Sequence, residues 1–231
     1  EIAICGKYTD MDDSYASVEE ALKHAAADLG GSVKISYVDT EEFAEDKLEG
    51  MDGVIIPGGF GSRGVEGKIE AIRHCRENDI PLLGLCYGMQ LMVVEFARNV
   101  LGIDAASAEF SSDDEIDIVS EMPDQKKIEQ MGGTMRLGSY TAKIVGQVSR
   151  IYGSDEAVER HRHRYEVDPD FHGRLEENGL KISGKMKGGD LAEYTELPEN
   201  SFFIGTQAHP EFTSRFQSPN PLYRSFLENA R

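Results

Sequence analysis

The chain of 231 residues carries 24 Lys and Arg against 42 Asp and Glu, a net charge of −18, and 39% of its residues are hydrophobic. This composition is typical of a globular protein with a sizeable core, and so acidic a surface repels nucleic-acid phosphates. No apolar run approaches the roughly 20 residues of a membrane span, and the 3 scattered cysteines form no disulfide framework. We therefore expect a cytoplasmic protein that binds neither nucleic acid nor membrane.

The first part of the chain alternates between short apolar runs and helical patterns. We expect strands at 2–5, 33–38, 54–56 and 82–85, and helices at 15–29, 67–78 and 89–101. Strands that alternate with helices at these spacings predict an α/β fold, a doubly wound, mostly parallel sheet with helices on both faces. Catalytic groups in such sheets lie at the carboxyl ends of strands, which is where glycine-rich loops follow residues 56 and 85.

The second half changes to short β-like runs separated by turns. We expect strands at 134–137, 140–145, 164–167, 180–184, 191–195 and 202–208, exposed loops at 113–115 and 122–125, and a closing helix at 221–229. These additional β-strands extend the same sheet or fold over it. No internal repeat or low-complexity linker divides the chain, so we predict one domain over residues 1–231.

Cys86 ends the apolar strand predicted at 82–85 and is flanked at two residues on either side by Gly84 and Gly88. An apolar helical segment follows at once. This is the strand–turn–helix pattern of a nucleophile elbow with Cys in place of Ser, in which a sharp turn leaves no room for a Cβ on either side. The positive end of the following helix favours thiolate over thiol. The pattern predicts a nucleophile, and a buried structural cysteine is the alternative.

The loop after the strand predicted at 54–56 has glycines at 58, 59 and 61. Such a loop can bring backbone N–H groups close to a ligand, as an oxyanion hole requires. In the elbow geometry the second donor is the amide of the residue after the nucleophile, Tyr87. A phosphate-binding loop is one alternative, although the chain contains no GxxxxGK[ST] sequence, and an ordinary glycine turn is another.

A cysteine nucleophile requires a base, and the chain has 6 histidines. His209 follows the apolar run predicted at 202–208, and Glu211 can orient its imidazole, so we predict these two as base and orienting acid. Of the others, two are expected on helix surfaces, one in a turn and two in a basic segment at 159–166: His24 and His74, His172, and His161 and His163. A zinc site built from the two histidines of that segment with His209 is the alternative.

These features together resemble a known family. Gly-Leu-Cys-Tyr-Gly-Met-Gln at 84–90, Pro-Gly-Gly-Phe-Gly at 57–61 and His-Pro-Glu at 209–211 are similar to the motifs of class I (triad) glutamine amidotransferases. The finer pattern resembles the glutaminase domains of CTP synthases. The segments that carry this finer similarity lie at 57–67, 135–138, 159–166 (Glu-Arg-His-Arg-His-Arg-Tyr-Glu) and 209–213. The similarity runs from the first strand to the last helix and implies a flavodoxin-like class I glutaminase fold.

The resemblance also implies roles for individual residues. Cys86 is the implied nucleophile, His209 the base and Glu211 its orienting acid, with no metal. The amides of Gly59 and Tyr87 form the implied oxyanion hole. Seven residues are implied to contact the glutamine substrate: Gly59, Tyr87, Gly88, Met89, Gln90, Glu109 and Arg164. A buried acid and an arginine suit the α-ammonium and α-carboxylate of glutamine, although a salt bridge within the basic segment is the alternative for the arginine.

The implied activity is hydrolysis of L-glutamine to glutamate and ammonia, with no cofactor in this domain. In CTP synthases an N-terminal synthetase domain uses ATP and Mg to aminate UTP with that ammonia, GTP is an allosteric activator (expected near residues 60–66), and the full enzyme is a homo-oligomer. This chain has neither room for such a domain nor a P-loop. We expect the glutaminase domain of a longer protein, with a stand-alone γ-glutamyl hydrolase or a catalytically silent regulatory module as alternatives.

Overall fold

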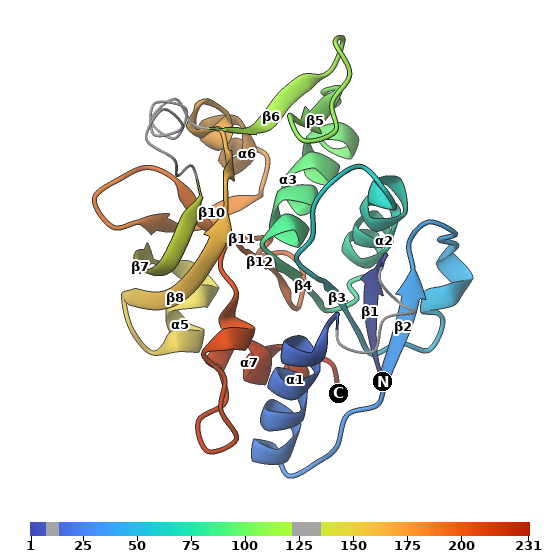
Figure 1. Cartoon of the computed structure of the whole chain (residues 1–231), viewed down its shortest axis with the longest axis vertical. Coiled ribbons are helices and arrows are strands. Elements are labelled where there is room, and N and C mark those ends of the chain that lie inside the picture. Colours follow the sequence, from blue (N-terminus) through green and yellow to red (C-terminus); the bar gives the residue numbers. More distant parts are fainter. Residues whose placement is uncertain (8–13, 122–134) are drawn as a thin grey trace.

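The computed structural model of the chain describes residues 1–7, 14–121 and 135–231. Within them, nine strands form one sheet in the order β2-β1-β3-β4-β12-β11-β10-β7-β8 (Figure 1). Its parallel half contains β2 (Ile35–Asp39), β1 (Ile2–Gly6), β3 (Gly53–Ile56), β4 (Leu82–Leu85) and β12 (Phe203–Thr206). Its antiparallel half contains β11 (Ala192–Glu196), β10 (Lys181–Met186), β7 (Arg136–Ile144) and β8 (Glu156–His163). The centre of the sheet therefore pairs β4 with β12, two strands that are far apart in sequence.

Helices cover both faces of this sheet. On one face α7 (Pro221–Asn229) contacts both α1 (Ala16–Asp28) and α5 (Gly146–Tyr152), and on the other α2 (Val65–Glu77) packs against α3 (Tyr87–Asn99). A second sheet contains β5 (Ala105–Ser107), β6 (Ile116–Glu121) and β9 (Tyr165–Val167). The remaining described elements are short: α6 (His172–Glu177) and the 3₁₀ helices η1 (Glu45–Leu48), η2 (Pro169–Phe171) and η3 (Pro210–Phe212).

Strand β1 shows how the sequence produces this layering. Ile2 and Ile4 belong to the core that includes α1 and α7, while Ala3 and Cys5 belong to the core that includes α2 and α3. Because helices cover both faces, the inner parallel strands β1, β3 and β4 are buried at every position and do not alternate polar with apolar residues. Continuous apolar runs of this kind are the pattern from which the sequence predicts these strands.

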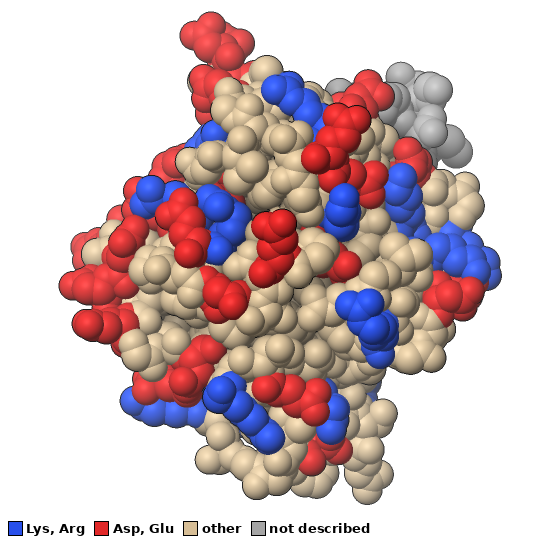
Figure 2. Space-filling view, turned by 180° about the vertical axis from the view of Figure 1, so that it is seen from behind, with Lys and Arg blue, Asp and Glu red and all other residues tan. Residues whose placement is uncertain are grey.

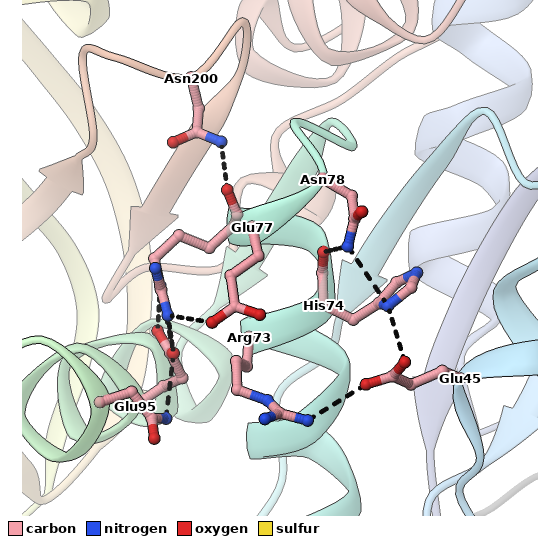
Figure 3. A network of polar contacts seen from close by, with 9 residues as sticks. Glu45, Arg73, His74, Glu77, Asn78, Glu95 and Asn200 are labelled. Atoms are coloured by element: carbon pink, nitrogen blue, oxygen red, sulfur yellow. Dashed lines mark hydrogen bonds and ion pairs between the residues drawn. The ribbon is translucent and has the colours of Figure 1, made fainter.

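A buried ion pair joins α2 to α3. Glu95 is fully buried, and its carboxylate accepts hydrogen bonds from Nε and Nη2 of Arg76 at 2.8 to 3.1 Å (Figure 3). Asn99 donates to the same carboxylate, and Asn200 donates to the backbone oxygen of Arg76. Glu77 binds the same guanidinium from the exposed side. Together these contacts fix α2 against α3 and against the loop that follows β11.

The predicted fold class is confirmed: a doubly wound parallel sheet with helices on both faces and additional strands from the second half of the chain. All seven elements predicted before residue 102 lie within two residues of their observed bounds. Their apolar runs and helical periods are long enough to be unambiguous, and most are bounded by glycine or proline.

The second half departs from the prediction. The two runs predicted at 134–137 and 140–145 form one strand, β7, which continues through Gly138 at φ +110°. Residue 134 and the loop predicted at 122–125 lie outside the described residues. Strands β5, β6 and β8 and helices α5 and α6 were not predicted. The two helices have 7 and 6 residues, too few to show a helical period, and the buried positions of β8 are mostly polar.

Charged side chains are scattered over the face shown in Figure 2. Asp and Glu side chains form several separate groups among uncharged residues, and Lys and Arg side chains are interspersed with them rather than gathered in one patch. The negative net charge is therefore spread over this face. Across the described part of the chain, no helix is both long and apolar enough to cross a membrane.

Candidate active site

Cys86 lies at the turn between β4 and α3, at the carboxyl edge of the parallel strands. Its backbone has φ +51° and ψ −102°, a conformation that costs a non-glycine residue about 1–3 kcal/mol. Two backbone hydrogen bonds hold it there, from Cys86 N to Thr206 O on β12 and from Gln90 N to Cys86 O. The side chain therefore precedes the first turn of α3, whose unpaired N–H groups favour a negative charge.

The two flanking glycines are required by close packing, as the elbow pattern predicts. A Cβ added to Gly88 would lie 2.1 Å from the backbone oxygen of Ile56 at the end of β3. A Cβ added to Gly84 would lie 2.3 Å from Sδ of Met92 and 2.9 Å from the backbone of Gly88. The first turn of α3 thus packs directly against the end of β3, and this contact fixes the sulfur relative to the loop that follows β3.

His209 is in hydrogen-bond contact with Cys86 and with Glu211. Its Nδ1 lies 2.7 Å from Oε1 of Glu211, which leaves Nε2 as the ring nitrogen for the cysteine. Burial lowers the pKa of His209, but the hydrogen bonds to Cys86 and Glu211 and their charges outweigh it and raise the pKa to about 10. The ring is therefore an imidazolium at neutral pH, which places a positive charge beside the sulfur. Backbone N of His209 also donates to Arg160 O at 2.8 Å, and the Phe212 ring stacks on the imidazole.

The other two cysteines have different surroundings. Cys5 and Cys75 are both completely buried. Burial raises the pKa of Cys5 to about 12 and raises the pKa of Cys75 as well. Both therefore remain thiols at neutral pH. Cys86, by contrast, lines a cavity.

The cavity at Cys86 has a volume of about 310 Å³, which is at the lower end of the volumes typical of small-molecule binding sites. Six of the residues expected in the site line it: Gly59, Cys86, Tyr87, Gln90, Glu109 and Arg164. Gly88 and Met89 do not, because Gly88 packs on Ile56 and Met89 is fully buried. His209 and Glu211 line a separate cavity of about 170 Å³.

The glycine-rich loop after β3 is held by side chains from other elements. Oε1 of Glu109, in the connection from β5 to β6, accepts from the amide of Gly61 at 2.9 Å, and the Tyr87 hydroxyl donates to Gly61 O at 2.7 Å. The ammonium of Lys68 is buried and lies 5.3 Å from the centre of the Tyr87 ring. Burial and repulsion from Lys7 lower the pKa of Lys68 to about 8. The side chain of Tyr87 and the ammonium of Lys68 were not expected here, since the motif assigned position 87 only a backbone role.

The two histidines of the basic segment at 159–166 are buried and belong to a polar cluster inside the protein. His161 Nδ1 lies 3.0 Å from His163 Nε2, and Arg136 binds Glu166 and Glu193 at 2.9 and 2.7 Å in the same buried cluster. Burial and the charge of Arg136 lower the pKa of His161 to about 3, and burial likewise lowers the pKa of His163. Burial raises the pKa of Glu166 to about 8, against the opposing effect of Arg136. Both histidines are therefore neutral.

The remaining alternatives from the sequence can be compared with this geometry. No group of three or more His, Cys, Asp or Glu side chains among the described residues could hold a metal ion, so the zinc alternative is not supported. Arg164 is exposed at the cavity and forms no ion pair with any described residue, which removes the salt-bridge alternative for its side chain. His172 begins α6 and is buried, and does not lie in a turn.

Comparisons with known proteins place this site in a family. The model of the family "Glutamine amidotransferase class-I" matches residues 10–229. The CTP synthases of Methanocaldococcus jannaschii and Desulfitobacterium hafniense are 49% and 50% identical to the chain, over 96% and 99% of its length. The chain spans 44% of the length of each.

Solved structures give the same result. The glutaminase domain of Trypanosoma brucei CTPS with bound acivicin superposes with a TM-score of 0.92 at 39% identity, covering 99% of this chain and 92% of that one. A glutamine amidotransferase from Thermotoga maritima superposes with a TM-score of 0.60 at 15% identity over 99% of this chain and 97% of that one, and shares the fold.

Proposed function

The chain belongs to the class-I glutamine amidotransferase family, and we propose that it hydrolyses L-glutamine to glutamate and ammonia through a thioester on Cys86. The observation that carries this proposal is the arrangement around the sulfur. Cys86 is held in a strained turn at a helix N-terminus, lines a cavity and contacts His209, whose other ring nitrogen is bound by Glu211. A nucleophile, a base and an orienting carboxylate in this order are the parts that acyl transfer requires.

The first half of the reaction breaks the carboxamide. The thiolate of Cys86 attacks the side-chain carbonyl carbon of glutamine, and the C=O electron pair moves to oxygen. The amides of Gly59 and Tyr87 stabilise that oxyanion, and removal of one such donor typically costs about 10²–10³-fold in rate. The imidazolium of His209 then gives its proton to the amide nitrogen, the C–N bond breaks, ammonia leaves and the thioester remains.

The second half releases glutamate. Water attacks the thioester carbonyl and gives a proton to the now neutral His209, and the same two amides stabilise the second oxyanion. The C–S bond then breaks, which restores the thiolate of Cys86 beside an imidazolium. Glu211 holds the ring in one orientation and stabilises its charge in both steps without itself accepting a proton.

Two charged residues that line the cavity suit the α-substituents of glutamine. Arg164 is free to bind the α-carboxylate, and Glu109 uses one oxygen on the Gly61 amide, which leaves the other for the α-ammonium. Both N–H bonds of the Gln90 side chain are used within the protein, on Tyr165 O and on Gln207. Gln90 therefore offers its oxygen to a donor group of the substrate.

We propose further that residues 1–231 are one glutaminase domain of a CTP synthase. The high identity to CTP synthases over nearly all of this chain supports the assignment. In the complete enzyme a synthetase domain would use the ammonia, with ATP and Mg, to aminate UTP to CTP. GTP as an activator acting near residues 60–66, and a homo-oligomeric assembly, belong to the same proposal.

The test uses labelling and turnover together. A glutamine-like diazo ketone should label Cys86 and leave Cys5 and Cys75 unmodified, because burial keeps those two thiols protonated. Cys86→Ala should abolish ammonia release from glutamine. In an enzyme that joins this chain to its synthetase domain, the same variant should still form CTP from added ammonia. Label spread evenly over the three cysteines would refute the assignment of Cys86 as the nucleophile. Loss of ammonia-dependent CTP formation in a folded Cys86→Ala variant would refute the claim that Cys86 serves only the release of ammonia from glutamine.

A stand-alone γ-glutamyl hydrolase predicts a different result. Such an enzyme would turn over γ-glutamyl amides and peptides at full rate without any partner domain. A catalytically silent module would show no labelling of Cys86 at all. The contact of Cys86 with the imidazolium of His209 favours the amidotransferase over the silent module.

A further inference from the structure

Gln207 is a completely buried polar residue that neither the motifs nor the resemblance assigns to the site. It follows β12 directly and lies two residues before His209. Its side-chain Nε2 lies 3.7 Å from Sγ of Cys86, within hydrogen-bond distance for sulfur. Its Oε1 accepts a hydrogen bond from Nε2 of Gln90 at 3.1 Å, and its backbone N donates to Glu193 O at 2.9 Å.

The direction of this amide is determined by a backbone carbonyl two steps away. Tyr165 O can only accept a hydrogen bond, so the group of Gln90 that lies 3.0 Å from it must be the NH₂. The same NH₂ faces Gln207, which must therefore present its oxygen to Gln90 and its own NH₂ to the sulfur. Reversing Gln207 would oppose two NH₂ groups in a buried site, where unpaired polar groups are costly.

We propose that Gln207 is a further catalytic residue, which donates a hydrogen bond to the Cys86 sulfur, and that Gln90 is the positioning residue through which Tyr165 orients it. The inference rests on the proposed function, since it needs Cys86 to be the nucleophile. A thiolate accepts a hydrogen bond more strongly than a thioester sulfur, because the donor then meets a full negative charge. The N–H of Gln207 therefore stabilises the sulfur as a leaving group when the thioester is hydrolysed. Between catalytic cycles the same hydrogen bond keeps the sulfur in the position from which it attacks.

This chain of bonds also gives Gln90 two roles on one side chain. Its NH₂ orients Gln207, and the residue also lines the cavity proposed to receive glutamine. Substrate binding and sulfur orientation are thus coupled through a single amide. A purely structural interpretation, in which two buried amides only satisfy one another, predicts no effect on the sulfur when the donor is replaced and the acceptor kept.

Gln207→Glu makes that replacement with one atom changed. The carboxylate keeps an oxygen for Gln90 but presents oxygen in place of N–H to the sulfur. We expect alkylation of Cys86 by iodoacetamide at neutral pH to slow by about ten- to hundredfold, as loss of a hydrogen bond to a charged acceptor implies. For glutamine hydrolysis kcat should fall by a similar factor while KM stays within about threefold, since the substrate contacts remain. Acidification that protonates the new carboxyl restores a hydrogen-bond donor to the sulfur. The alkylation rate and kcat of the variant, each relative to the unsubstituted chain at the same pH, should therefore recover.

Two further variants complete the experiment. Gln207→Met removes donor and acceptor at similar volume and should slow alkylation at least as much, without recovery in acid. Thr195→Val changes a buried hydroxyl on the neighbouring strand β11 that has no hydrogen-bond partner within the described part of the chain, and should leave alkylation and kcat unchanged. In the unsubstituted chain the side-chain amide protons of Gln207 should shift in NMR spectra when Cys86 is alkylated, whereas those of the half-buried Gln147 on α5 should not.

The outcomes separate this inference from the proposed function. If the unsubstituted chain neither reacts at Cys86 nor releases ammonia from glutamine, both are overturned. If it does both but Gln207→Glu alkylates and turns over at the same rate, only the role of Gln207 is overturned. A rise in KM at constant kcat overturns it as well, because that assigns Gln207 to substrate binding. Should the variants fail to fold, a Gln207 amide signal that does not shift on alkylation overturns the role in the unsubstituted chain.

Discussion

Replacing Gly88 by alanine tests whether the packing of α3 on β3 controls the chemistry at Cys86. The added Cβ would lie 2.1 Å from the carbonyl oxygen of Ile56 and 3.0 Å from the carbonyl carbon of the same residue. Strand β3 and the first turn of α3 must therefore separate by about 1 Å to reach an ordinary contact. Overpacking of this kind costs about 1–3 kcal/mol. Because Ile56 leads directly into the loop with Gly59, the separation would also move the proposed oxyanion donor on Gly59 away from the sulfur. A misplacement of about 1 Å can cost about 10²-fold in rate.

The assay measures the free energy of unfolding in urea and the rate of diazo-ketone labelling at Cys86 on the same preparation. We expect a loss of about 1–3 kcal/mol in stability and about a hundredfold loss in labelling rate for Gly88→Ala. Gly173→Ala is the matched control, since Gly173 is likewise the second residue of a helix, α6, but a Cβ there meets no atom within 4 Å. That change should be neutral or stabilise by up to about 1 kcal/mol and leave labelling unchanged.

A Gly88→Ala chain that labels at the unsubstituted rate would refute the reasoning. It would mean that the turn relaxes without moving the sulfur relative to the glycine-rich loop, so the oxyanion donors would not depend on this contact. Equal destabilisation by the two alanine variants would refute it differently, because the cost would then come from the loss of glycine in a first helical turn and not from the clash with Ile56.

The remaining predictions concern two carboxylates. Glu211→Gln removes a charge bonded to His209, so the pKa of His209 should fall from about 10 toward its ordinary 6.5, as ¹⁵N NMR of the imidazole would show. Because that pKa is raised by folding, His209 stabilises the fold fully below pH 6.5 and loses this effect as pH rises through about 10. The stability deficit of the variant should therefore shrink above pH 10, and an unchanged titration would contradict the assignment. Glu95→Ala leaves Arg76 without its buried partner and should cost about 3–5 kcal/mol of unfolding free energy in urea (Figure 3). Glu77→Ala removes the exposed partner of the same guanidinium and should cost less than about 1 kcal/mol, so similar losses would show that burial is not the cause.

Sequence alone locates the residues carried by the parallel strands. Cys86 and His209 both follow apolar strands, and such strands end at one edge of a parallel sheet, so the sequence brings the two side chains to the same edge. The register confirms that placement, because Leu85 of β4 pairs with Thr206 of β12. The pattern could not show that these two strands are neighbours, since strand order depends on crossovers that local periodicity does not encode.

The residues that come from outside the parallel strands could not be placed in this way. Glu109 lies in a connection between two strands that were not predicted, and Arg164 lies between β8 and β9. Only the resemblance indicated them, and the structure brings both to the wall of the cavity. Gln207 carried no signal at all, because one buried amide within an apolar run looks like an interruption of a strand and not like a ligand of sulfur.

The segment at 159–166 shows the physical reason why charge is a poor guide near this site. In β8 successive side chains point to opposite faces, so its Glu and His residues at 159, 161 and 163 are buried while its Arg residues at 160 and 162, and Arg164 just after it, are exposed. Burial holds the two histidines neutral, so they add no positive charge. The positive charge of the segment therefore lies entirely on the arginines, and Arg162 and Arg164 present it to the cavity. A motif that appears to be one basic cluster is thus a period-two strand, with one face that builds the polar support beneath the site and one face suited to the carboxylate of an amino acid.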